Sequence, residues 1–142
     1  MGFDFFGNRA LEQPGLETGI SCMAGAKVIQ RDANTLSFIV DRGGPVKVSF
    51  FGVPNLARLA PPHVAKDTGL QVASLLDLAG TKASVVQLRA EAKDYMDIDA
   101  LITLGGIGLP TAVAAAREVD LDHLPTIDSA SQREVRDHGF EP

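Results

Sequence analysis

The chain is predicted to fold as an α+β protein, with a small, mostly antiparallel sheet in its N-terminal half packed with helices from its C-terminal half. Two observations predict this division. Short runs of β-branched and aromatic residues alternate with turn residues up to about residue 52, and helical periodicity with capping signals follows from Ser74. With 142 residues and 45% hydrophobic content, the chain can pack one core. We expect a single domain over residues 1–142, with a variable polar tail at 120–142.

Four strands are expected in the N-terminal half. The first, Gly2–Phe6, places Phe3 and Phe5 on one face and Asp4 on the other. The other three runs are Ala26–Arg31, Thr35–Val40 and Val46–Phe51. They are separated by the turn sequences Asp-Ala-Asn and Arg-Gly-Gly-Pro, so they predict an antiparallel meander.

Weaker patterns occupy the rest of this half. Leu16–Met23 is expected to form a short helix after Pro14, and Leu70–Val72 a final short strand. His63 lies in a polar, proline-broken segment and is expected to be an exposed loop residue.

A central helix is expected to begin near Leu75, because Ser74 and Asp77 form a capping box. Behind it, four residues recur at helical spacing on one stripe: Leu78, Lys82, Val85 and Arg89. Lys82 is therefore expected to be half-immersed in a core face. Two interpretations remain open for it: a lysine whose stem packs while its ammonium reaches water, or a cation directed at a phosphate.

A second helical segment follows Arg89. Its expected apolar stripe consists of Tyr95, Ile98, Leu101 and Ile102. Asp94 and Asp97 share another face, and Lys93 with Asp97 has the spacing of an ordinary solvated ion pair. Glycines at 105, 106 and 108 are expected to end this segment, and Pro110 to open a helix at Thr111–Val119. In the tail, Ser131 and Glu134 predict one more helix cap.

Composition narrows the classes of function. The net charge of -5 argues against a generally basic nucleic-acid surface, although a local basic patch at Lys82, Arg89 and Lys93 stays open. The one cysteine, Cys22, is interpreted as a small packed residue rather than a nucleophile. No apolar run approaches the roughly 20 residues that span a bilayer, and no signal peptide is visible, so a cytoplasmic location is expected. Neither His123 nor His138 has metal-ligand spacing, so no zinc site is assigned.

The pattern D-L-x-x-x-K followed, after a short gap, by R-x-x-x-K-D-Y-x-D resembles two motifs of the AbiEii/AbiGii-type nucleotidyltransferase toxin family. The matching residues are Asp77, Lys82, Arg89, Lys93, Asp94 and Asp97. Further stretches of resemblance are DFF at Asp4–Phe6, NTLSFIV at Asn34–Val40, VKVSFFG at Val46–Gly52 and GLPTAVAAAR at Gly108–Arg117. The resemblance covers most of the chain up to about Val119.

The resemblance implies a nucleotidyltransferase-like fold, with Mg²⁺ and a nucleoside triphosphate as cofactor and substrate. It implies Asp4, Asp94 and Asp97 as catalytic carboxylates, with Asp4 also a metal ligand. It implies Lys82, Arg89 and Lys93 as the residues that bind the nucleotide, with Lys82 on phosphate. An RNA or protein acceptor and an antitoxin protein are the partners it implies.

The sequence departs from the family pattern at the metal site. A glycine-serine element and an Asp-x-Asp strand are expected there, but the chain begins after the glycine-serine position, and Gly2 stands in place of the first aspartate. Ser49 stands where a third carboxylate is expected. One strand carboxylate makes a poor two-metal site.

Two functions therefore remain open. The first is a nucleotidyltransferase-like toxin that transfers a nucleotide from a nucleoside triphosphate to RNA or protein, with activity either retained or lost. The second is a noncatalytic remnant or subunit that binds a partner protein or a nucleotide.

A homodimer is also expected. The strand at Gly2–Phe6 opens the chain, so an apolar sheet face or an unpaired edge near its phenylalanines requires a cover, and a second copy is the simplest one. The alternative cover is the tail at 120–142 folding back over the gap.

Overall fold

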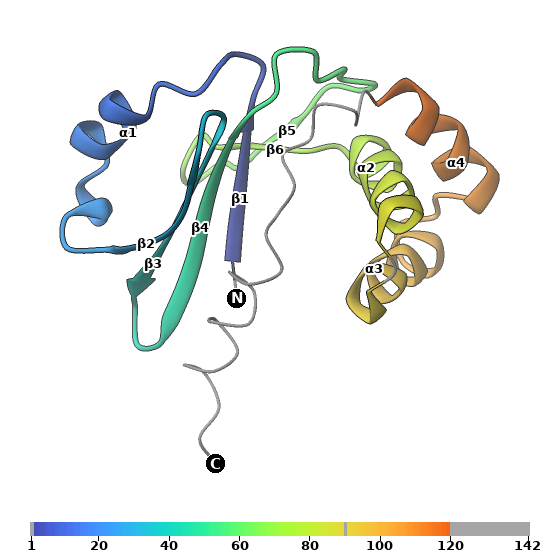
Figure 1. Ribbon diagram of the computed structural model, residues 1–142. Helices are drawn as coiled ribbons and strands as arrows, with labels where there is room; N and C mark the ends of the chain where they lie inside the picture. The colour runs from blue at the N-terminus through green and yellow to red at the C-terminus, as the bar shows by residue number, and fades with distance from the viewer. Residues whose placement is uncertain (1, 90, 120–142) are drawn as a thin grey trace. The chain divides into compact units, whose positions relative to one another are not determined.

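A computed structural model describes residues 2–89 and 91–119, which divide into two compact units, residues 2–55 and residues 56–119 (Figure 1). The first unit contains a four-stranded sheet, and the second contains three helices and a small hairpin. The predicted α+β class is confirmed. The helix cap predicted at Ser131 and Glu134, like the whole segment 120–142, lies outside the described residues.

The sheet has the strand order β1-β4-β3-β2. Its strands are β1 (Gly2–Gly7), β2 (Lys27–Asp32), β3 (Thr35–Asp41) and β4 (Pro45–Gly52). Strands β2, β3 and β4 form the antiparallel meander that the turn sequences predicted. The β3–β4 turn depends on Gly43 and Gly44, whose φ angles of 76° and 146° suit glycine. Strand β1 pairs in parallel with β4 and forms one edge of the sheet.

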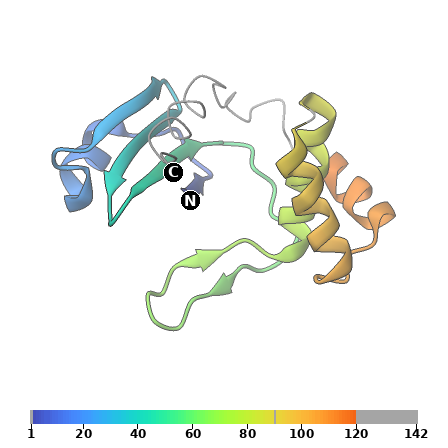
Figure 2. The same ribbon diagram turned by 90° about the horizontal axis from the view of Figure 1, so that it is seen from below.

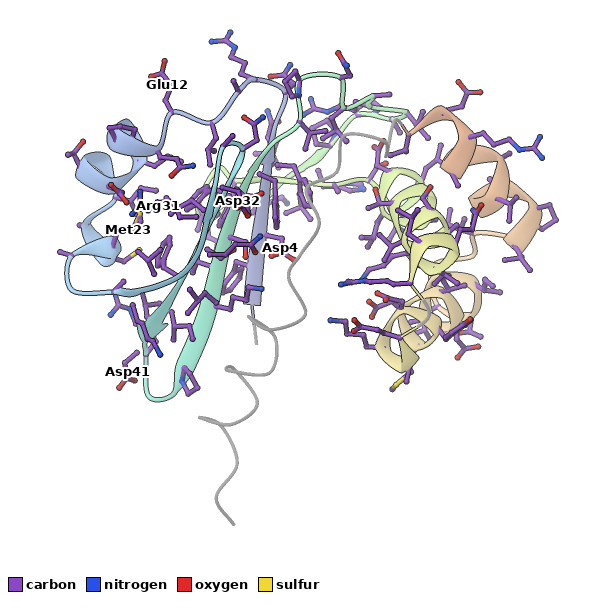
Figure 3. The ribbon with its side chains drawn as sticks, in the orientation of Figure 1. Asp4, Glu12, Met23, Arg31, Asp32 and Asp41 are labelled. Carbon is purple, nitrogen blue, oxygen red and sulfur yellow. The ribbon has the colours of Figure 1, made fainter. Side chains whose placement is uncertain are left out.

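One face of the sheet carries the core of this unit. The fully buried Leu36 and Phe38 on β3 pack with Val48 on β4 and with Met23. The cover of this face is α1 (Gln13–Gly19) and the short 3₁₀ helix η1 (Ser21–Met23), so the one helix predicted at Leu16–Met23 is in fact two. The α helix starts earlier than predicted because Pro14 lies in its first turn. Arg31 on β2, labelled in Figure 3, forms an ion pair with Glu17 that joins α1 to the sheet.

The second unit begins with a two-stranded hairpin, β5 (His63–Val64) and β6 (Gln71–Val72), visible as a separate ribbon in Figure 2. Its helices are α2 (Leu75–Leu88), α3 (Ala92–Thr103) and α4 (Leu109–Glu118). The predicted helix starts near Leu75 and Pro110 are therefore confirmed. His63 is exposed, as predicted, but belongs to β5 rather than to a loop.

The buried face of α2 differs from the predicted stripe. Its buried residues are Ala79, Gly80, Ala83 and Ser84, whereas Leu75 and Leu78 are exposed. Small residues line this face because α4 packs closely on it through Ala112 and Ala115. A Cβ added to Gly80 would meet the Cβ, C and O atoms of Ala115 at 3.1 Å. The side of α2 that faces inward is therefore the side with small residues, which let α4 pack closely, and not the side with large aliphatic residues.

The predicted apolar stripe of α3 is also wrong in part. Leu101 is buried, but Tyr95 and Ile102 are exposed. Asp94 takes an inward position instead, and its side chain is fully buried. The reason is electrostatic, because two cations of the preceding helical segment meet this carboxylate, as described next.

Candidate functional site

The capping box at the start of α2 ties the helix to the preceding loop. The Ser74 hydroxyl accepts a hydrogen bond from the Asp77 backbone N–H at 3.0 Å and donates one to Asp77 Oδ2 at 2.6 Å. The other oxygen of Asp77 accepts from the backbone N–H of Leu59 at 2.7 Å. Asp77 belongs to the D-L-x-x-x-K motif, and here one of its oxygens binds the Ser74 hydroxyl and the other binds the loop backbone at Leu59.

Lys82 lies one and a half turns further along α2 and meets two carboxylates of α3. Its Nζ is 2.5 Å from Asp97 Oδ2 and 3.5 Å from Asp94 Oδ1. The Lys82 side chain is 25% exposed, Asp97 is 48% exposed and Asp94 is 0% exposed. The lysine that the sequence placed in a half-buried stripe therefore has its ammonium held by acids of the neighbouring helix.

Arg89, the C-cap residue of α2, completes the surroundings of Asp94. Its Nε is 3.6 Å from Asp94 Oδ2, so each oxygen of the buried carboxylate faces a different cation. Neither oxygen of Asp94 has a hydrogen-bond partner within the described residues. A separation of 3.5–3.6 Å is a charge interaction rather than a hydrogen bond. Asp94 is thus held by charge alone.

Glu91, the N-cap residue of α3, links the remaining cations. One of its oxygens is 3.6 Å from Arg89 Nη1, and the other is 3.3 Å from Lys93 Nζ. The three cations expected to form a basic patch are therefore interleaved with three carboxylates. The α2–α3 charge cluster, as we call it, consists of Lys82, Arg89, Lys93, Glu91, Asp94 and Asp97.

A largely apolar groove runs beside this cluster. Two charged residues, Lys82 and Asp97, contribute to its lining. The others are Leu75, Leu78, Ala100, Leu101, Leu104 and Gly105. A molecule in the groove would therefore lie beside Lys82 and Asp97, whereas Asp94 does not line it.

Asp4 belongs to the sheet unit, on β1 (Figure 3). The parallel register pairs it with Ser49 on β4, which pairs in turn with Ser37 on β3. Paired residues of neighbouring strands share a face, so these three side chains form one row across the sheet. The two serines are buried, and the Ser37 hydroxyl donates to the Ser49 hydroxyl at 3.0 Å. Asp4 therefore has hydroxyl neighbours in the row, not carboxylates.

The structure brings together five of the six predicted site residues in the α2–α3 charge cluster, and places the sixth, Asp4, in the other unit. Among the described residues, no group of three His, Cys, Asp or Glu side chains is arranged to hold a metal ion. Two contributors were missed from the sequence. Glu91 was not among the candidate residues, although its place between Arg89 and Lys93 was a usable signal. Ser37 gave no signal, because its role depends on strand register.

The fold and the motif residues together define the class of protein. A small mixed sheet with helices, and a lysine on α2 facing aspartates on α3, agree with a nucleotidyltransferase-like protein. A family model described as nucleotidyl transferase AbiEii toxin, type IV toxin-antitoxin system, matches residues 7–142. The chain therefore belongs to the AbiEii nucleotidyl transferase toxin family. No curated protein and no solved structure matches it. None of the helices within residues 2–89 and 91–119 has the length and apolar character needed to cross a bilayer.

Proposed function

We propose that this protein binds a nucleoside triphosphate through the α2–α3 charge cluster and transfers its nucleotide to RNA or protein at a very low rate. The observation that carries the proposal is the position of Lys82, which is partly exposed at a groove and lies in the recognised motif. Arg89 and Lys93 belong to the same cluster, where both lie beside Glu91, and they are proposed to supply further positive charge to a bound phosphate chain. A cytoplasmic location, an antitoxin protein as partner and an RNA or protein acceptor belong to the same proposal.

The carboxylates are assigned by their accessibility. Within the helical unit, Asp97 is exposed and is proposed as a catalytic acid. Within the sheet unit, Asp4 is exposed and is proposed as a catalytic acid and metal ligand. Asp94 matches the catalytic motif in sequence, but a fully buried side chain cannot touch a substrate in this geometry.

Mg²⁺ is the metal that this family implies, and the residues fit it incompletely. Asp4 supplies one carboxylate oxygen ligand, and its neighbours in the row, Ser49 and Ser37, are neutral and bonded to each other. Mg²⁺ at such sites commonly takes one or two carboxylates together with substrate phosphates. Asp4 is therefore proposed as one ligand of a metal whose other ligands come from outside this row, not as a preformed metal site.

A noncatalytic role is the second candidate. The row Asp4, Ser49 and Ser37 favours it, because Ser49 stands where the family resemblance implies a third carboxylate and its neighbour in the row is a second hydroxyl. In this role the protein keeps the fold to bind a partner protein or a nucleotide.

The substitution Lys82→Ala is expected to weaken binding of a magnesium-nucleoside triphosphate about tenfold or more, since a hydrogen bond to a charged group contributes about 1.5–3 kcal/mol. Isothermal calorimetry on the parent and the variant measures this. Lys66→Ala is the matched control, because it removes one positive charge from an exposed position of the same unit. Equal affinity in parent and Lys82→Ala rejects the assignment of Lys82, and no binding by either favours the noncatalytic role.

We also propose a homodimer that forms along β1. This strand is an edge of the sheet, and its Phe3, Phe5 and Phe6 are all exposed. An exposed edge with apolar side chains invites pairing with a second copy of the same strand. Size-exclusion chromatography with light scattering is expected to give the dimer mass for the parent and the monomer mass for Phe5→Asp. Val64→Asp, at an exposed site of β5, should leave the dimer intact. A parent that elutes with monomer mass at micromolar concentration refutes the proposal.

A further inference from the structure

We infer that the two aspartates facing Lys82 have opposite functions: Asp97 is an exchangeable counter-ion that a polyphosphate chain displaces, and Asp94 is a positioning residue that keeps the ammonium in place during the exchange. The inference rests on the proposed function, because it assumes that Lys82 binds phosphate. It concerns how that binding is controlled, and it changes the part played by Asp94 from acid or base to support.

Asp94 cannot be exchanged without a large penalty. Its side chain is fully buried, and its two oxygens face Lys82 and Arg89 separately. Removing this carboxylate would leave Lys82 and Arg89 with only their partly exposed partners, Asp97 and Glu91. Moving it toward solvent would require α2 and α3 to part. Asp94 is also absent from the lining of the groove. An incoming anion therefore meets Lys82 from the other side.

Asp97 occupies that other side. It is about half exposed, it lines the groove together with Lys82, and it contacts the ammonium at 2.5 Å. Ion pairs between partly exposed groups contribute little to stability because water and side-chain entropy offset most of the attraction. A phosphate oxygen carries comparable charge and can accept from the same ammonium hydrogen. Asp97 thus occupies the place that a phosphate would take.

The exchange has a consequence for the reaction. While Asp97 accepts from Lys82, its carboxylate is engaged and is a poor base or ligand. Once a phosphate takes its place, the carboxylate is released into the groove beside the bound chain. Binding of the triphosphate would therefore free the acid residue that the proposed transfer requires, with no bond made or broken in the exchange itself.

Anion binding by two variants can distinguish a positioning role of Asp94 from a general effect of negative charge near Lys82. Each Asp→Asn substitution removes one negative charge near Lys82, so charge alone predicts that both variants bind an anion more tightly. The positioning role predicts opposite signs. Asp97→Asn should bind more tightly because no carboxylate competes, and Asp94→Asn should bind more weakly because the ammonium loses its fixed support.

The test uses inorganic tripolyphosphate as the probe and calorimetry on the full chain. Asp97→Asn is expected to bind about three- to tenfold more tightly than the parent. Asp94→Asn is expected to bind at least about threefold more weakly. Asp99→Asn is the matched control, since it removes one charge from an exposed position of α3, and it should stay within about twofold of the parent. Any of three results overturns the inference. Asp97→Asn binds no more tightly than Asp99→Asn, Asp94→Asn binds as tightly as the parent, or no variant binds.

A further variant covers the case in which Asp94→Asn does not fold, as circular dichroism would show. Lys82→Ala combined with Asp97→Asn should bind no more tightly than Lys82→Ala alone, because the gain passes through Lys82; a retained gain overturns the inference. The expected pattern with tripolyphosphate, but no transfer from nucleoside triphosphates, supports the inference and counts against transfer. Transfer from nucleoside triphosphates without the expected tripolyphosphate pattern supports the proposed transfer and overturns the inference.

Discussion

Gly80→Leu is expected to lower the free energy of unfolding of the helical unit by about 1–2 kcal/mol. The α2–α4 contact leaves no room at this position, since even a methyl group would stand 3.1 Å from three atoms of Ala115, two of them backbone. Overpacking of this kind costs about 1–3 kcal/mol, and a leucine forces α4 away from α2. The gain in helix propensity over glycine, about 0.5–1 kcal/mol, offsets only part of this.

Urea denaturation followed by circular dichroism and by the fluorescence of the single tyrosine, Tyr95 on α3, measures this effect. Gln87→Leu is the matched control, because it adds the same side chain at an exposed position of α2 and should change stability by about 0.5 kcal/mol or less. Gly80→Ala should lie near the parent, because its propensity gain and its steric penalty are of similar size. If Gly80→Leu is as stable as the Gln87→Leu control, the described packing of α2 on α4 is wrong.

Nucleotide transfer by the parent protein is expected to be very slow or absent. The sheet face offers Asp4, while the positions that should carry its partner carboxylates hold Gly2 and Ser49. A serine hydroxyl is neutral and cannot neutralise the developing charge or replace a carboxylate ligand. Ser49 is moreover buried and bonded to Ser37, so it is not available to a substrate.

Much of the sheet unit follows from the sequence because its signals are local. The Arg42–Pro45 turn, with Gly43 and Gly44 at positive φ, sets the β3–β4 hairpin. The cap at Ser74 likewise sets the start of α2. The β3–β4 turn and the α2 cap each depend on residues within a few positions of one another, so both can be predicted from a single sequence.

The inward faces of the helices could not be predicted in the same way. Periodicity gave weight to large apolar residues such as Leu78, but α2 turns Ala79, Gly80 and Ala83 inward because α4 comes close. Asp94 was placed on a polar face, and it is buried because Lys82 and Arg89 reach it. Both outcomes depend on contacts between separate helices. The members of the α2–α3 charge cluster were nearly all identified, whereas their pairing was not.

The central claim is that Asp4 lacks the partner carboxylates that nucleotide transfer requires. The rate of label transfer from a radiolabelled nucleoside triphosphate tests it most directly. The rate is compared between the parent, Gly2→Asp, and Gly2→Asp combined with Asp4→Asn. Gly2 lies two residues before Asp4, so an aspartate there would share its face, and the site is exposed, with its nearest obstacle the Lys47 carbonyl oxygen at 3.3 Å from an added Cβ. The account predicts transfer near background for the parent, a rise of about tenfold or more in Gly2→Asp, and loss of that rise with Asp4→Asn. Rapid transfer by the parent, or a rise in Gly2→Asp that persists when Asp4→Asn is added, would contradict it.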